Sequence, residues 1–173
     1  MKRNKILSIK ISFALALLLS CFLATAQRPT VEVLTSGNGI SLRGNKGTVG
    51  RSNNGGKTWK WMTVTGFEKN DFRDIEGFDG ATAVIMTVAE PAYILKTTDG
   101  GETWKVVYEN RTKGMFLDAM EFWNEQAGII VGDPIDGRFF ITRTFDGGNT
   151  WQDIPFANRP VADSGEACFA ASG

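Results

Sequence analysis

Six charged residues are the candidates for binding a ligand: Glu90, Arg111, Asp133, Asp136, Arg138 and Arg159. They lie in short segments that are rich in Pro, Gly and charge and that separate apolar stretches, which is the composition of surface loops. Loops held by a rigid scaffold are frequent places for binding residues. For each carboxylate the alternative is a solvated turn, in which it only hydrogen-bonds the local backbone.

The composition excludes several kinds of catalysis and cofactor within this chain. The sequence contains no histidine, which rules out Ser-His-Asp and Cys-His catalysis here and argues against a zinc site. It shows no nucleotide-binding glycine loop after a strand and no cluster of metal-ligand residues. We therefore expect no cofactor and no metal, and we assign no catalytic residue.

An eight-residue unit occurs three times, at 52–59, 97–104 and 144–151, and the rest of the chain is organised around it. Its pattern is a hydroxyl residue, any residue, Asp or Asn, two glycines, any residue, Thr and Trp. The defining positions are Ser52, Asn54, Gly56 and Trp59; Thr97, Asp99, Gly101 and Trp104; and Thr144, Asp146, Gly148 and Trp151. Asp or Asn followed by glycines favours a tight turn, and the Trp begins the next strand.

The spacing of these units indicates the fold class. The three tryptophans are 45 residues (59 to 104) and 47 residues (104 to 151) apart, and a period of about 40–50 residues is typical of propellers and solenoids. We predict an all-β fold, namely an incomplete β-propeller of four-stranded antiparallel blades spanning residues 27–173. It would hold about three blades and the first strand of a fourth.

The second and third blades can be aligned strand by strand. The aligned pairs are 72–78 with 116–122 (innermost strand), 81–88 with 126–131 (second) and 92–97 with 139–144 (third). Outer strands follow the repeated units at 59–64, 104–108 and 151–156, and residues 164–170 have the pattern of a fourth innermost strand. The first blade has little room before its unit, so we expect it to be shortened.

The three units resemble the Asp-box, or BNR repeat, of sialidases, sortilin-type propellers and photosystem II assembly-factor-like propellers. In those families the box joins the third and fourth strands of a blade, on the face opposite the usual ligand mouth. The first copy in this sequence has Asn54 where Asp is commoner. The resemblance implies that the six candidates lie on the opposite rim, in the connections 66–71, 88–91, 109–114, 132–138 and 158–163. Glu90-Pro91 and Asp133-Pro134 would then take equivalent places on that rim.

The resemblance leaves more than one function open. The photosystem II assembly-factor-like propellers imply a non-catalytic binding or assembly protein, which we favour over an enzyme. The alternative is a sialidase-like glycoside hydrolase, whose arginines and Tyr/Glu pair would lie mostly in C-terminal blades missing from this chain. Asp74 or Asp118 could be its acid by position alone, and Arg43 stands in a poor match to that family's early motif. A sortilin-type peptide-binding propeller is a third possibility.

Residues 1–26 predict a secretory signal. Lys2, Arg3, Lys5 and Lys10 form a positive segment before the apolar run 11–23, and Ala24-Thr25-Ala26 is a small-x-small cleavage site. A rival interpretation takes Leu18–Cys21 as a bacterial lipobox, which would place a lipid on Cys21. Either interpretation predicts an exported protein, which would be periplasmic, secreted or on the outer surface.

Charge narrows the choice of partner. Cleavage would remove four of the 19 basic residues and none of the 19 acidic ones, leaving 15 against 19 and a net charge of −4. This argues against nucleic acid, which requires a basic surface. We expect a protein or glycan ligand at the rim, and membrane attachment only through a lipid on Cys21. The remaining cysteine, Cys168, would have no disulfide partner within the chain and is expected to be an inert thiol.

Overall fold

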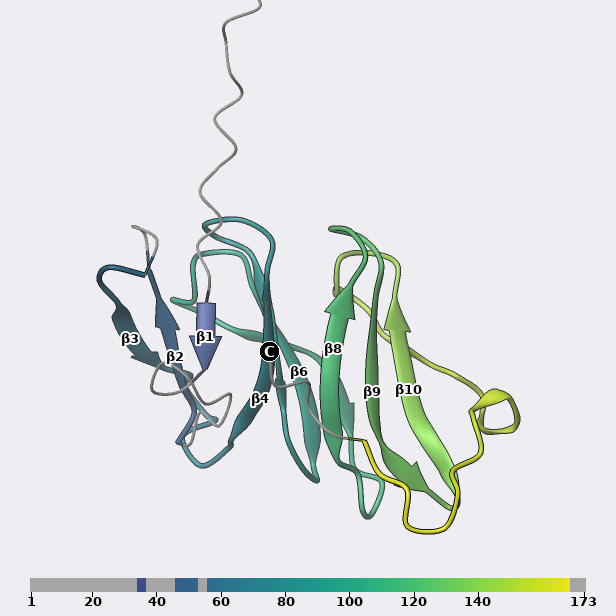
Figure 1. Ribbon diagram of the computed structural model, residues 1–173. Helices are drawn as coiled ribbons and strands as arrows, with labels where there is room; N and C mark the ends of the chain where they lie inside the picture. The colour runs from purple at the N-terminus through teal and green to yellow at the C-terminus, as the bar shows by residue number, and fades with distance from the viewer. Residues whose placement is uncertain (1–33, 37–45, 53–55, 169–173) are drawn as a thin grey trace, which may run out of the picture.

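The described residues of the computed structural model, 34–36, 46–52 and 56–168, form three antiparallel sheets (Figure 1). The first sheet has the order β1 (Leu34–Ser36), β2 (Thr48–Arg51) and β3 (Lys60–Thr63). The second contains β4 (Phe72–Gly77), β5 (Ala83–Thr87), β6 (Ala92–Thr97) and β7 (Lys105–Asn110). The third contains β8 (Leu117–Phe122), β9 (Gly128–Ile135), β10 (Arg138–Thr144) and β11 (Gln152–Asp153), and the short 3-10 helix η1 (Phe156–Asn158) follows it.

The sheets stand side by side with their first strands adjacent. β1 lies beside β4, and β4 lies beside β8 (Figure 1). Each complete sheet follows the chain from an innermost to an outermost strand, as in a propeller blade. The fold is a partial β-propeller, which confirms the predicted fold class, and the first sheet has three strands in the part of the chain that is described.

The second and third repeated units form the tight turns between the third and fourth strands of their sheets. Thr97 Oγ1 accepts a hydrogen bond from the Gly101 N–H at 3.0 Å and donates one to Asp99 Oδ1 at 2.8 Å. Asp99 in turn accepts the N–H of Thr103 at 2.9 Å and its hydroxyl at 2.5 Å. Gly100 and Gly101 have φ values of 74° and 87°, which only glycine adopts at little cost.

The same bonds recur around Asp146 in the third unit, where Thr144 and Thr150 take the places of Thr97 and Thr103. In the first unit, Ser52 Oγ accepts the Gly56 N–H at 2.8 Å. Asn54 lies outside the described residues, as does the predicted signal with Cys21.

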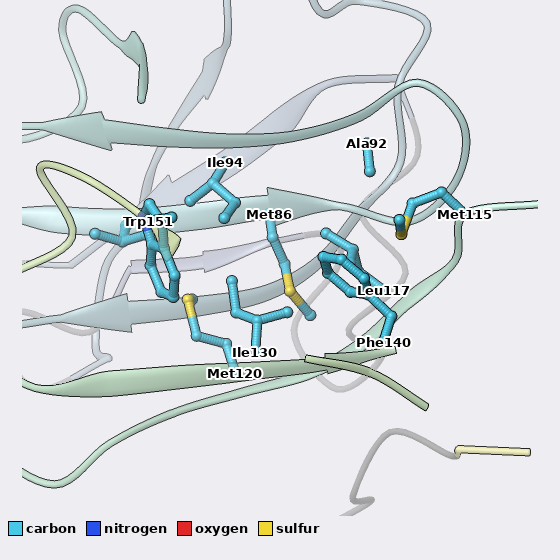
Figure 2. Packing of buried hydrophobic residues seen from close by; sticks show 10 residues of the cluster. Met86, Ala92, Ile94, Met115, Leu117, Met120, Ile130, Phe140 and Trp151 are labelled. Atoms are coloured by element: carbon cyan, nitrogen blue, oxygen red, sulfur yellow. The ribbon is translucent and has the colours of Figure 1, made fainter. Parts of the chain in front are cut away.

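Two apolar clusters fill the spaces between the sheets. The one between the first and second sheets is formed by Val49, Val64, Phe72, Ile85 and Leu95. The larger one, between the second and third sheets, includes Met86, Ala92, Ile94, Leu117, Met120, Ile130, Phe140 and Trp151 (Figure 2). Every residue of β5 is buried, as expected for a strand covered on both faces. Trp61 of β3 lies outside both clusters and is 44% exposed.

The predicted alignment of the innermost strands is wrong by one residue. Phe72 pairs with Thr87 and Leu117 pairs with Gly132, which are equivalent places in the two sheets. Phe72 therefore corresponds to Leu117, and not to Phe116. Each strand also carries one extra residue at a register shift, between Phe72 and Asp74 in β4 and between Leu117 and Ala119 in β8. The extra residues are Arg73 and Asp118.

Two further expectations differ from the structure. Residues 132–138 are not one loop, because β9 continues to Ile135 and only Asp136 and Gly137 form the turn to β10. Asp133-Pro134 therefore lies in a strand, whereas Glu90-Pro91 lies between β5 and β6. The expected innermost strand at 164–170 is not formed over residues 164–168, which begin with a turn at Ser164 and Gly165; residues 169 and 170 lie outside the described part.

Candidate functional site

The two extra residues of the innermost strands meet across the boundary between the second and third sheets. Arg73 Nη2 lies 3.1 Å from Asp118 Oδ1, and Arg73 Nε also donates to the Asp118 carbonyl at 3.4 Å. The Arg73 side chain is 16% exposed and that of Asp118 only 1%. A bulge re-aims a side chain out of the regular alternation of a strand, and here it joins two sheets through a buried ion pair.

The second oxygen of Asp118 faces another carboxylate. Asp118 Oδ2 is buried and has no hydrogen-bond donor among the described residues. Burial, followed by the charge of nearby Asp133, raises the pKa of Asp118 to about 6, although Arg73 acts in the opposite direction. Burial and the neighbouring negative charge therefore favour the protonated form of Asp118.

Asp133 also holds the segment that follows the third sheet. Its Oδ1 accepts the backbone N–H of Cys168 at 2.9 Å. Cys168 is a half-buried free thiol, and burial followed by the charges of Asp118 and Asp133 raises its pKa. Since the thiolate is the reactive form, this environment disfavours the reactive form of Cys168.

Three more carboxylates extend this acidic region along β4 and β8. Asp74 accepts the N–H groups of Ile75 at 2.8 Å and Met120 at 2.9 Å. Burial raises the pKa of Asp74 more than these two bonds lower it, so the pKa is raised. Burial, followed by the charges of Glu121 and Asp74, also raises the pKa of Glu76. Glu121 is exposed.

We refer to Asp74, Glu76, Asp118, Glu121 and Asp133 as the acidic wall. Within the described part of the chain, Arg73 is the only basic residue that forms an ion pair with any of them. Like charges crowded into a partly buried region disfavour the ionised form. A cation that reached the wall would relieve this repulsion.

The predicted rim residues of the second sheet mainly bond to their surroundings. Glu90 Oε2 accepts the Gly114 N–H at 3.1 Å, and the neighbouring Ala89 bridges to Phe116. Glu90 therefore joins the β5–β6 connection to the segment before β8. Arg111 is 71% exposed and pairs with Glu109, its Nε lying 2.5 Å from Oε1.

The predicted rim residues of the third sheet form a separate group. Arg138 Nη1 donates to the carbonyl of Arg159 at 2.6 Å, and Arg159 Nε donates to the carbonyl of Ile154 at 2.7 Å. Their guanidinium groups also stack on Phe156 and Phe140 respectively. Asp136 is exposed in the turn to β10. These arginines fasten the segment after β11 to β10.

Of the six predicted site residues, the structure brings only Asp133 to the acidic wall. Sequence reasoning considered Asp74 and Asp118 as acids but missed Arg73, which connects the two sheets. The only signal in the sequence was that a basic and an acidic residue stand at nearly the same place in successive repeats. That these two places are equivalent, and that each is a bulge, is visible only in the strand pairing.

Two other kinds of site are absent from the described ranges. No group of three or more Cys, Asp or Glu side chains there is arranged to hold a metal ion. Those ranges also contain no helix with the length and apolar character needed to cross a membrane.

Comparison with known proteins gives modest structural likenesses. No family model matches the sequence, and no curated protein matches it. A solved structure of YCF48 bound to D1 peptide has a TM-score of 0.49 and 25% sequence identity, covering 72% of this chain and 41% of that one. YCF48 from Cyanidioschyzon merolae has a TM-score of 0.47 and 19% identity, covering 72% and 40%. The chain thus spans about two fifths of the length of these structures.

Proposed function

We propose that this protein is a non-catalytic β-propeller that binds a positively charged segment of a partner protein along the acidic wall. The observation that carries the proposal is the imbalance of charge in this region, where four carboxylates of β4 and β8 and Asp133 of β9 are accompanied, among the described residues, by the single ion-paired cation Arg73. The chain would act by holding its partner, and the β-sheets would supply a rigid frame.

The raised pKa values of Asp74, Glu76 and Asp118 support this role. They mean that the folded protein keeps carboxylates where burial and mutual repulsion oppose their ionisation, which is frequent at functional sites. A lysine or arginine side chain would supply the missing positive charge and several hydrogen-bond donors. Glu121 is exposed and Glu76 is half-buried, so these two would make the first contacts.

A protein ligand fits this wall better than a neutral glycan does, because hydroxyl groups supply no charge. Complementary charge also speeds encounter and excludes partners of the wrong sign. The predicted rim residues would have a supporting part, since Glu90, Arg138 and Arg159 hold connections of the second and third sheets in place.

The identity of the repeats and the export of the protein are part of the same proposal. The hydrogen bonds around Asp99 and Asp146 support the assignment of the units as Asp-boxes that stabilise blades. The basic and apolar pattern of residues 1–26 supports export, with a lipid on Cys21 as the alternative means of retention.

One observation favours the alternative glycoside hydrolase. Asp118 has a pKa of about 6, which suits a general acid near neutral pH. Its side chain is only 1% exposed and is paired with Arg73, so a glycosidic oxygen could reach it only if that pair separated. This geometry favours the binding function over the catalytic one.

The proposal is tested by the affinity for a labelled peptide of alternating Lys and Ala, measured by fluorescence anisotropy. We expect saturable binding that weakens as salt is raised, and we expect the double variant Glu76→Gln/Glu121→Gln to weaken it by about tenfold. Glu125→Gln, which changes an exposed carboxylate outside the wall, should bind as the unaltered protein does. Equal affinity for an alternating Glu and Ala peptide, or no effect of the double variant, would refute the proposal.

A further inference from the structure

Asp118 is the most deeply buried carboxylate of the acidic wall, and its charge is only partly balanced. Its side chain is 1% exposed, one of its oxygens is paired with Arg73, and Oδ2 has no hydrogen-bond donor among the described residues. The charged groups that act on it are Asp133 of β9 and Arg73 of β4, and the half-buried Cys168 thiol also lies nearby. Asp118 therefore has one negative and one positive neighbour and almost no contact with water.

Two carboxylates of β4 lie in a similar place, at the boundary between the second and third sheets. Asp74 accepts the Met120 N–H of β8 at 2.9 Å, and the charged groups that act on it are Glu121 and Arg73. Glu76 is half-buried, and the charged groups that act on it are Glu121 and Asp74, which are both negative. The strands β1 and β5, which also lie beside β4, have no titratable residue. Burial and like charge thus act on Glu76 in the same direction.

The other side chains of the protein keep their charge over the range in which these carboxylates change theirs. The sequence has no histidine, which is the side chain whose ordinary pKa lies near 6.5. Ordinary aspartates and glutamates are ionised above about pH 5. By contrast, burial followed by the charge of Asp133 raises the pKa of Asp118 to about 6, and burial raises the pKa values of Asp74 and Glu76. Between about pH 5 and 7 the change in side-chain charge is therefore concentrated in the wall.

We propose that the acidic wall holds a basic segment at neutral pH and releases it in mild acid, when its buried carboxylates, Asp118 first, take up protons. The inference rests on the proposed function and adds how that site would be regulated. Protonation of the carboxylates leaves the charge of Arg73 unchanged, so the wall becomes less negative and attracts a Lys or Arg side chain less strongly. The reverse also holds, because a bound cation favours the ionised carboxylates, and binding must therefore release protons.

The test is the affinity for the labelled peptide of alternating Lys and Ala, measured by fluorescence anisotropy at constant ionic strength between about pH 5 and about pH 8. The lysines of the peptide stay charged throughout this range, so a change in affinity reports on the protein. We expect the dissociation constant to rise by about tenfold from about pH 7.5 to about pH 5.5. Glu125→Gln, an exposed change outside the wall, should give the same pH profile as the unaltered protein.

Two further measurements make the test specific for the buried carboxylates. Asp118→Asn keeps an acceptor for Arg73 but has no charge at any pH, so it should bind more weakly at neutral pH and with a shallower pH profile. Calorimetric titration of the unaltered protein at about pH 6, in two buffers with different ionisation enthalpies, measures the protons exchanged, and we expect net release. Near-UV circular dichroism at each pH checks that the fold is kept.

The results distinguish a failure of this regulation from a failure of the proposed function. Equal affinity at about pH 5.5 and about pH 7.5, binding without proton release, or an unchanged pH profile in Asp118→Asn would overturn the regulation and leave the proposed function standing. No binding of the peptide at any pH would overturn both. The calorimetric titration uses the unaltered protein, so it decides the matter even if Asp118→Asn does not fold.

Discussion

Asp118 is the residue whose surroundings differ most from those of an ordinary carboxylate. One oxygen is paired with Arg73, while the other is buried without a donor next to Asp133. An unsatisfied charged oxygen is costly in such a place, and protonation of the carboxyl removes most of that cost. Burial therefore favours the protonated form of the Asp118 carboxyl in the folded protein.

This environment predicts how stability depends on pH. The pKa of Asp118 is raised from 3.8 to about 6, so its contribution is complete below 3.8 and is lost as pH rises through about 6. In Asp118→Asn the amide keeps an acceptor for Arg73 and offers a donor to Asp133, so this loss should vanish. Urea unfolding at several pH values measures it, with Asp136→Asn as an exposed control. An unchanged slope in Asp118→Asn would contradict the account.

The repeated turns are the elements that could be predicted best from the sequence. Asp, two glycines and Thr suffice to build them, because every bond around Asp99 is local. The spacing of these turns along the chain then predicts where the third and the outer strand of each blade lie. The Asp136-Gly137 turn was missed, although both residues have positive φ, 53° and 77°, which is the two-residue hairpin geometry that Asp-Gly favours.

The Asp99 turn yields a prediction of its own. Asp99→Ala removes two hydrogen bonds from Thr103 and one from Thr97 and should lower the free energy of unfolding by about 1–2 kcal/mol. Hydrogen bonds from Thr103 and Thr97 lower the pKa of Asp99 to about 2, so its contribution is lost as pH falls from about 4 toward 2. Chemical unfolding of Asp99→Ala beside Glu125→Ala measures both effects. Equal unfolding midpoints for Asp99→Ala and Glu125→Ala would show that the glycines alone hold the turn.

On the scale of the whole molecule, the contacts between successive sheets could not be predicted from the sequence. Arg73 with Asp118 and Lys96 with Gly147 join residues 45 and 51 positions apart, and each contact depends on how the sheets stack. Each innermost strand also carries an extra residue, Arg73 in β4 and Asp118 in β8, and the expected alignment of the two strands was wrong by one residue. Nothing in a single sequence marks such a bulge, since Arg and Asp fit a regular strand edge equally well.

The contact of Lys96 with the third unit predicts coupling between sheets. Lys96→Met keeps the apolar stem and loses the bonds to the Gly147 carbonyl and Asn149, so we expect a loss of about 1 kcal/mol in the free energy of unfolding. Lys105→Met, on the exposed start of β7, is the matched control. Thermal unfolding followed by tryptophan fluorescence compares them, and equal stabilities would mean that the contact contributes nothing.

The central claim is that the innermost strands form a binding surface for a basic segment of a protein. NMR amide shifts recorded while the alternating Lys and Ala peptide is added test it most directly. The account predicts that the largest changes fall on β4 and β8, around Glu76 and Glu121, and that they fade as salt is raised. Changes confined to the connections around Glu90, Arg138 and Arg159, or no changes at all, would contradict it.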